Sequence, residues 1–395
     1  MNAELFRWAR ETAGLSLDQA AKSLGIKDAG RLVAIETGAQ VPSRPLLLKM
    51  ARQYRRPLVT FYLAVPPAKG DRGQDFRTLP RDRTIADDAL LDAMIRDIKA
   101  RQAVVRSLAE DEDDAVPLPF IGSATMRDGV EAVLASIRST LGIDVSEYRR
   151  QGKSAEAFSY LRGKAESAGI FVLLIGNLGT HHSAIAVETF RGFAIADEFA
   201  PFVIINDQDA NTAWSFTLLH EIAHLWLGTT GVSGTSNEKA IEKFCNDVAS
   251  GFLLSLSELS ELRISDETPP EEAIRLLRAF AKERHVSQKM VAYALFRSAR
   301  LSLAGWERLD VTLNDQWIKE KAARKERKTP GESGPNYYIV RRHRLGRALL
   351  DFVDRSIGAG ALTPVKAAKV LGVKPRSVYP LLMTLGQLGA AGLRG

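Results

Sequence analysis

Three short apolar runs near the middle of the chain predict β-strands. The first, Ile170–Ile175, is bounded by Gly169 and Gly176, and two others cover residues 190–196 and 202–205. Apolar runs of this length between turn residues are typical of buried strands. The pattern therefore predicts a small sheet in this part of the chain.

Around these strands the apolar positions recur with a helical period. Asn206, Asp207 and Asp209 can cap a helix over residues 210–227. The same periodicity predicts helices over residues 18–24, 28–36, 43–54, 87–108, 237–254, 270–284 and 287–302. We therefore expect an α+β multidomain chain in which helices predominate.

Breaker-rich and charged stretches suggest where the domains end. We expect an all-α helix-turn-helix domain over residues 1–67 and an α+β domain over residues 121–318. Between them, residues 68–120 form a connector with one helix and an acidic linker. Residues 319–336 read as a charged linker, and residues 337–395 as a small basic, winged-helix-like domain.

One segment of the N-terminal part is echoed near the C-terminus. Residues 15–27 and 362–374 share the pattern L-[ST]-x-x-x-A-A-K-x-L-G-[IV]-K, with seven identities in thirteen positions. Each copy reads as the first helix and turn of a helix-turn-helix unit. The alternative is a chance match between two amphipathic helices.

The charge distribution points to nucleic acid at the two ends. The 395-residue chain has a net charge of +7, yet residues 1–70 hold 11 Lys and Arg against 5 Asp and Glu, and residues 337–395 hold 10 against 2. Basic ends around an acidic middle favour nucleic-acid contact, although solvated basic helices give the same count.

Composition also excludes several protein classes. No apolar run approaches the length of a membrane span, and the N-terminus lacks the apolar segment of a secretory signal. A single cysteine, Cys245, excludes an intramolecular disulfide framework and a cysteine-rich zinc site, and we expect it to be buried. A cytoplasmic location is the expectation that fits these features.

The motif His220-Glu221-Ile222-Ala223-His224 lies on the helix predicted over residues 210–227. Residues i and i+4 share one helix face, so the two imidazoles can bind one Zn²⁺. Glu221 stands about 100° round the helix, where its carboxylate can take a proton from the attacking water. The alternative is a buried helix with two hydrogen-bonded histidines.

A catalytic zinc site needs a third protein ligand. On the next helix, Glu238, Glu242 and Asn246 share a face, and Glu242 is the central candidate for the ligand. Asn246 is a candidate for orienting a histidine. For stabilising the oxyanion, His285, Tyr293 and Arg297 are candidates, each of which also fits a structural role. The adjacent pair His181-His182 would point to opposite sides of a strand, so we do not expect it to bind the metal.

In these blocks the chain resembles the ImmA/IrrE family of bacterial metallopeptidases. The resemblance lies in FRGFAIADEFAPFVIINDQDA, FTLLHEIAHLWLG and IEKFCNDVASGFLL. In that family a glutamate ligand is followed by Cys or Ala three residues on and Asn four residues on, which falls here on Glu242, Cys245 and Asn246. The family block usually ends in L-L-M-P, whereas this chain has Phe252-Leu253-Leu254-Ser255 and lacks the proline.

The resemblance implies a zincin-like fold for the α+β domain over residues 121–318. It also implies a zinc-dependent endopeptidase that cleaves a specific regulatory protein, often a DNA-binding repressor. We expect the substrate to lie extended along an edge strand near residues 190–196 or 202–205. The alternative is a transcriptional regulator or antitoxin-like protein that binds its partner, such as a toxin, without cleaving it. A purely structural zinc site is a third alternative, which the presence of Glu221 weakens.

Residues 4–63 resemble the Xre-type helix-turn-helix domain. In that module the second paired helix enters the major groove, which places Lys27 and Arg31 against DNA. Asp28 and Gly30 at the same helix start weaken this expectation. The candidate backbone contacts are Arg52, Arg55 and Arg56. The module could instead serve homodimerisation or partner binding.

Overall fold

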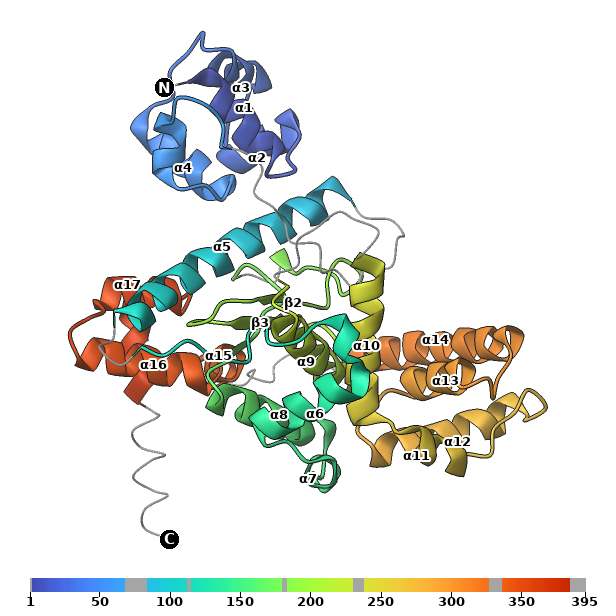
Figure 1. The fold of residues 1–395 in the computed structure, drawn as a ribbon. Helices are drawn as coiled ribbons and strands as arrows, with labels where there is room; N and C mark the ends of the chain where they lie inside the picture. Colours follow the sequence, from blue (N-terminus) through green and yellow to red (C-terminus); the bar gives the residue numbers. More distant parts are fainter. Residues whose placement is uncertain are drawn as a thin grey trace.

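The computed structural model describes residues 2–67, 84–111, 115–179, 183–229, 238–326 and 336–383. The N-terminal part is helical. In Figure 1 it lies on the side of α5 that faces away from the sheet. Its elements are α1 (Ala3–Glu11), α2 (Leu17–Leu24), α3 (Ala29–Glu36), α4 (Arg44–Gln53) and the 3₁₀ helix η1 (Leu58–Tyr62). They enclose a hydrophobic core of their own, which includes Phe6, Leu32 and Phe61.

Local sequence signals set the ends of these helices. Ser16 caps α2 in a capping box with Gln19, and Gly25 ends the helix in the left-handed conformation at φ 71°. Asp28 caps α3 by accepting the N–H of Gly30 at 2.8 Å. The buried guanidinium of Arg10 donates two hydrogen bonds to the carboxylate of Glu36, at 2.7 and 2.9 Å, which ties α1 to α3.

The three predicted strands form one sheet. They are β1 (Phe171–Leu174), β2 (Gly192–Ile195) and β3 (Phe202–Ile205), in the order β1-β3-β2. β1 runs parallel to β3, and β2 runs antiparallel to it. The expectation that residues 202–205 form an edge strand is therefore wrong, because β3 is central and bonds to both neighbours.

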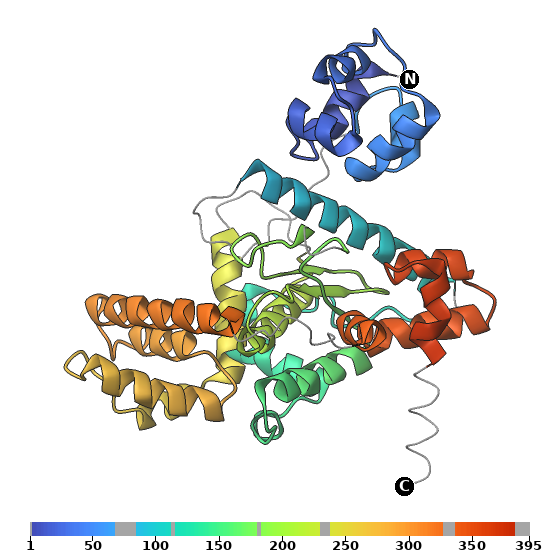
Figure 2. The same cartoon turned by 180° about the vertical axis from the view of Figure 1, so that it is seen from behind.

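Every residue of the sheet is buried, because both faces are covered. Side chains alternate along each strand: Val172, Val203 and Ile205 join the core on the α9 side, whereas Phe171, Phe202 and Ile204 join the core on the α5 side. Figures 1 and 2 show α5 crossing one face and α9 lying on the other. Double-sided burial explains why the strands read as continuous apolar runs.

The remaining helices surround this sheet, with α11 to α14 projecting to one side (Figure 2). They are α5 (Ile85–Glu110), η2 (Met126–Asp128), α6 (Val130–Leu141), α7 (Val145–Arg149), α8 (Ser154–Ser167), α9 (Asn211–Trp226), α10 (Glu238–Leu253), α11 (Leu256–Glu261), α12 (Pro270–Glu283), α13 (Gln288–Arg297), α14 (Leu303–Glu326), α15 (Tyr337–Leu345), α16 (Arg347–Gly358), α17 (Pro364–Val370) and η4 (Pro375–Ser377). None of the described helices has the length and hydrophobicity needed to cross a bilayer.

Two of these helices differ from the sequence pattern. The helix expected over residues 287–302 ends at Arg297, and Ala299 follows in the left-handed conformation at φ 57°. A new helix, α14, then runs from Leu303 to Glu326, across the expected boundary between the α+β domain ending at residue 318 and the charged linker over residues 319–336. Its Leu309 and Leu313 belong to the same core as α9.

The C-terminal helices pack on the sheet and on α5. Leu345, Leu349 and Val353 share one hydrophobic core with Phe171 of β1 and Met94 of α5. A winged-helix fold is not confirmed, since the described residues 336–383 contain helices and turns only.

A buried ion pair fixes this packing. Arg162 of α8 bonds to Glu166 at 3.0 Å, and Glu166 accepts the backbone N–H of Arg347 at the start of α16, also at 3.0 Å. A Cβ on Gly346 would stand 2.1 Å from Glu166 Oε1, so the corner between α15 and α16 fits only glycine. Burial raises the pKa of Glu166 and lowers that of Arg162.

Candidate metal centre

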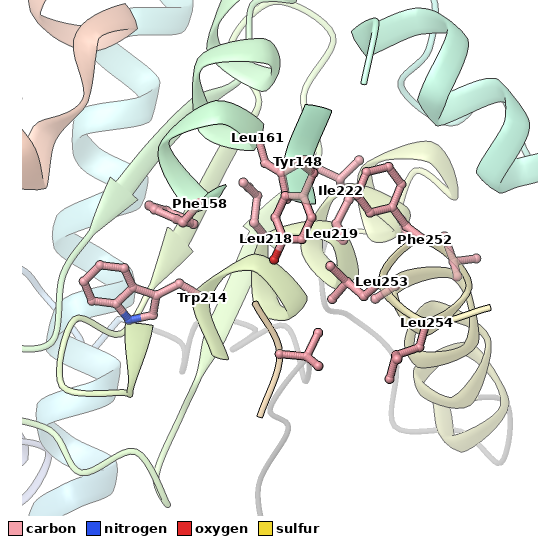
Figure 3. Packing of buried hydrophobic residues seen from close by; sticks show 14 of the residues in the cluster. Tyr148, Phe158, Leu161, Trp214, Leu218, Leu219, Ile222, Phe252, Leu253 and Leu254 are labelled. Atoms are coloured by element: carbon pink, nitrogen blue, oxygen red, sulfur yellow. The ribbon is translucent and has the colours of Figure 1, made fainter. Parts of the chain in front are cut away.

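Helix α9 carries the histidine motif through the middle of the core. Its residues from Trp214 to Trp226 are buried with the exception of Phe216, because the sheet, α8 and α10 surround it. Figure 3 shows Leu218 and Ile222 of this helix in the same cluster as Tyr148 and Phe252. Rigid packing of this kind holds the orientation of any side chain that α9 presents.

Three potential ligands from α9 and α10 converge on one point. The Nε2 atoms of His220 and His224 lie 3.2 Å apart. Glu242 places one carboxylate oxygen 3.4 Å from Nε2 of His220 and the other 3.4 Å from Nε2 of His224. The structure thus brings together the three residues that the sequence nominated as ligands.

The spacing of the two histidine nitrogens fits a tetrahedral zinc ion. Ligand bonds of about 2.0–2.1 Å in a tetrahedron place neighbouring ligand atoms about 3.3 Å apart. The two Nε2 atoms are 3.2 Å apart, and each lies 3.4 Å from a different oxygen of the Glu242 carboxylate, so the histidine pair has this spacing and the carboxylate faces both rings. Two imidazoles and one carboxylate are also the donor set of catalytic zinc sites that keep a fourth position open. The residues present therefore fit the metal.

Thr229 holds one of the two histidines, a role that the sequence pattern did not reveal. Its Oγ1 lies 3.0 Å from Nδ1 of His224 and 3.4 Å from the carbonyl oxygen of the same residue. Nε2 of His224 faces the other ligands, so a metal bound there requires the ring proton on Nδ1, where the Thr229 hydroxyl is placed to accept it.

The end of α9 places Thr229 where it can make this contact. Gly228 adopts the left-handed conformation at φ 65°, and Thr229 N–H donates to the carbonyl of His224 at 3.1 Å. A Cβ on Gly228 would stand 2.9 Å from Cα of Gly122. The backbone N–H of Gly122 in turn donates to the carbonyl of Leu225 at 3.0 Å. The sequence could indicate that Gly228 ends the helix, but it could not indicate that the Thr229 hydroxyl points toward His224.

Glu221 is fully buried beside this group and lies against the backbone of β2. A Cβ on Gly192 would stand 2.6 Å from Glu221 Oε1 and 2.6 Å from Cγ2 of Thr217. β2 is an edge strand within the described residues, so the candidate base lies directly beneath that edge. The sequence pattern placed Gly192 in a predicted strand, but it did not indicate that this glycine leaves room for the Glu221 carboxylate.

The centre is almost closed to solvent. His220 and Glu221 are 0% exposed and His224 is 2% exposed, whereas the side chain of Glu242 is 25% exposed. Among the three candidate ligands, the carboxylate of Glu242 is thus the most accessible. A low-dielectric environment of this kind strengthens electrostatic interactions with developing charge.

Other candidates from the sequence lie elsewhere or are not tested. Asn246 follows Glu242 by one turn, and its buried Oδ1 has no hydrogen-bond partner among the described residues, so its orienting role stays a prediction. Cys245 is buried, as predicted. His181 and His182 lie outside the described residues.

The three candidate oxyanion donors have structural neighbours. His285 packs edge-on against Tyr148, with ring centroids 5.7 Å apart, and its φ is 54°. Tyr293 packs against Trp306 at 5.4 Å, and Arg297 lies 3.6 Å from the carboxylate of Asp247. Among the described contacts, none connects these residues to the His-His-Glu group.

In the N-terminal domain, the candidate DNA contacts divide into two groups. Lys27, Arg31 and Arg52 are exposed, as is Arg55, which adopts φ 52°. Arg56 instead lies over the ring of Trp8 at 4.1 Å and donates to Oγ1 of Thr12 at 2.7 Å. Burial, with a smaller contribution from Arg96, lowers the pKa of Arg56 to about 10. Arg56 therefore stabilises the domain internally.

The fold and the site define a helix-turn-helix domain joined to a metallopeptidase-type domain. Residues 3–60 match the family model described as a helix-turn-helix domain. Residues 169–296, which include the three strands and all three candidate ligands, match the model described as an IrrE N-terminal-like domain, a peptidase family. No curated protein sequence and no solved structure matches the chain significantly.

The chain is therefore a fusion of a helix-turn-helix domain with an IrrE-like peptidase-family domain, and the resemblance seen in the sequence is confirmed. The peptidase family is typically metal-dependent, and some of its members are not catalytic. The helix-turn-helix domain supports DNA binding, and together the two domains support a regulator with a protease-type domain.

Proposed function

We propose that the chain is a zinc-dependent endopeptidase that cleaves a specific regulatory protein and is anchored to DNA by its N-terminal domain. The observation that carries the proposal is the convergence of His220, His224 and Glu242 beside buried Glu221. A closed structural site would not need a carboxylate base next to it.

Each residue has a separate task in this proposal. His220, His224 and Glu242 would hold the metal, which supplies Lewis acidity toward a carbonyl and a lowered pKa for water. Glu221 takes the proton of the attacking water and passes it to the leaving amine. Thr229 keeps the His224 ring in its ligating tautomer. β2 offers the edge along which an extended substrate could pair.

The decisive experiment compares wild type with Glu221→Gln in zinc content and in partner cleavage. We expect both proteins to hold one equivalent of zinc and only wild type to generate new termini in a captured partner. Glu283→Gln, which removes a carboxylate with a 74% exposed side chain from α12, is the control and should behave as wild type. Full cleavage by Glu221→Gln would refute the mechanism.

The second candidate function is partner binding without cleavage, as in an antitoxin-like regulator. The closure of the centre favours it, since His220 and Glu221 are 0% exposed. In this case wild type and Glu221→Gln would hold the same intact partner, with no new termini in either. The same capture experiment therefore separates the two functions.

We propose that the N-terminal domain contacts DNA through Lys27 and Arg31, and that Arg52 and Arg55 contact the DNA backbone. Lys27 and Arg31 are exposed at the start of α3, the helix that enters the major groove in such modules. Replacing both with Gln should weaken binding to the operator, and Arg56→Gln should chiefly lower the stability of the domain. Equal operator affinity of Lys27→Gln/Arg31→Gln and wild type would contradict this assignment.

A further inference from the structure

The two segments that share a sequence pattern, residues 15–27 and 362–374, also have similar backbone geometry. Ser16 accepts the N–H of Gln19 at the start of α2, and Thr363 accepts the N–H of Lys366 at the start of α17. The two turns end with the same hydrogen bonds: Ile26 N–H to Ala21 at 2.9 Å, and Val373 N–H to Ala368 at 2.9 Å. Their glycines, Gly25 and Gly372, have φ of 71° and 60°.

A second helix follows the turn in both copies. In the N-terminal copy it is α3, capped by Asp28, with Leu32, Ile35 and Glu36 buried. In the C-terminal copy it begins with η4, for which Lys374 is the N-cap, and continues as helix through residues 378–383, with Val378, Leu381 and Leu382 buried. The buried positions follow the N-cap at the same spacing, so both copies are helix-turn-helix units.

The exposed faces of the two copies differ in charge. Lys366 stands where α2 has Gln19, and Val365 stands where α2 has Asp18. The second helix of the C-terminal copy starts one residue earlier, so Lys374, which aligns with Lys27 in sequence, takes the N-cap position of Asp28, and Arg376 takes the position of Gly30. Lys369 keeps the charge of Lys22. The C-terminal copy has therefore lost both acids of the N-terminal copy and gained cations.

The sequence around the C-terminal motif contains no acidic residue over a long stretch. The last 41 residues, 355–395, contain no Asp or Glu and six Lys or Arg. Lys366, Lys369, Lys374 and Arg376 are all exposed, whereas the buried residues of α17 face the core shared with α5 and the sheet. Arg341 is not part of the surface, because it donates to the carbonyls of Leu371 and Gly372 at 2.8 and 2.7 Å.

We propose that the C-terminal helix-turn-helix unit is a second surface for duplex DNA, which binds phosphates through Lys366, Lys369, Lys374 and Arg376. The two-helix motif supplies the shape, and the four exposed cations supply the charge complementarity. The inference is independent of the peptidase, since it uses no residue of the metal centre.

The test measures binding of the full chain to a fluorescent 24-base-pair duplex of mixed sequence, over a range of salt concentrations. Lys27→Gln and Arg31→Gln are present in every protein, so that the N-terminal domain does not mask the effect. Replacing the four cations with Gln should weaken binding by ~10–100-fold and lower the slope of log K against log salt by about 3–4. The matched control removes four exposed cations elsewhere, Lys153, Arg275, Lys282 and Lys319, and should cause a smaller loss with little change in slope.

A single substitution separates charge from folding. Lys374→Asp copies the cap of the N-terminal unit, so it should raise stability while it weakens DNA binding severalfold. If the four-cation variant and Lys374→Asp bind the duplex as tightly as the control, the proposal is wrong.

Discussion

Gly192 of β2 and Glu221 of α9 are in such close contact that any side chain on Gly192 would displace the carboxylate. A Cβ at this position would stand 2.6 Å from Glu221 Oε1 and 3.0 Å from the carbonyl oxygen of Ile204. The position of the Glu221 carboxylate therefore depends on the absence of a side chain at Gly192. A substitution of Gly192 alone can test this dependence.

Gly192→Ala should abolish cleavage while zinc stays bound, because the carboxylate must move but the three ligands need not. Overpacking should also lower the free energy of unfolding by about 1–3 kcal/mol. Gly163→Ala on α8 is the control: a Cβ there meets nothing within 4 Å, and the helix should gain about 0.5–1 kcal/mol. Zinc content, peptide cleavage and urea unfolding of both variants check this. Unimpaired cleavage by Gly192→Ala would show that Glu221 tolerates displacement.

Thr229→Val should weaken zinc binding by about 10–100-fold, since the Nδ1–H of His224 loses its acceptor and the ring loses its fixed tautomer. Thr229→Ser keeps the hydroxyl and should retain most of the affinity. Competition with a chromophoric chelator measures both without reference to activity. Equal affinities for Thr229→Val and wild type would contradict the positioning role.

Arg162→Met should detach the C-terminal helices from the rest of the protein. It leaves Glu166 buried without its partner, and breaking a buried ion pair from one side costs about 3–5 kcal/mol. Hydrogen exchange should accelerate in α15 and α16 more than in α10. Arg150→Met, on an arginine with a 72% exposed side chain, is the control and should leave exchange unchanged. Uniform exchange rates in Arg162→Met would mean that the hydrophobic core alone holds these helices.

Glu258 should contribute to stability only above acidic pH. Burial opposes its ionisation, but hydrogen bonds from Arg149 and Ser255 outweigh burial and lower its pKa from 4.5 to about 2. The unfolded chain therefore binds the proton first as pH falls. The contribution is complete above pH 4.5 and disappears as pH falls toward 2.

We thus expect Glu258→Gln to lower the free energy of unfolding by about 1–3 kcal/mol at pH 7, with the difference from wild type shrinking between pH 4.5 and 2. Denaturant unfolding at a series of pH values measures this. Glu261→Gln removes a carboxylate with a 67% exposed side chain that also contacts Arg284, and it should have little effect. A constant difference for Glu258→Gln across this range would contradict the pKa assignment.

The sequence by itself determined the local elements and the identity of the metal-binding candidates. The apolar runs gave β3 with the same bounds as observed, and the i, i+4 spacing placed His220 and His224 on one helix face, since both depend on contacts between near neighbours. Glu242 was found in the same way, from its position on the next helix and from the family pattern.

Only the tertiary structure decided which strand is central, where Thr229 and Gly192 lie, and what the C-terminal unit packs on. Strand order, the contact of Gly192 with Glu221 and the Arg162–Glu166 contact with the start of α16 join segments far apart along the chain. A single sequence shows the periodicity within each segment, but it does not show which segments contact one another in the fold. These relationships are fixed by the burial of both sheet faces, which is a property of the whole fold.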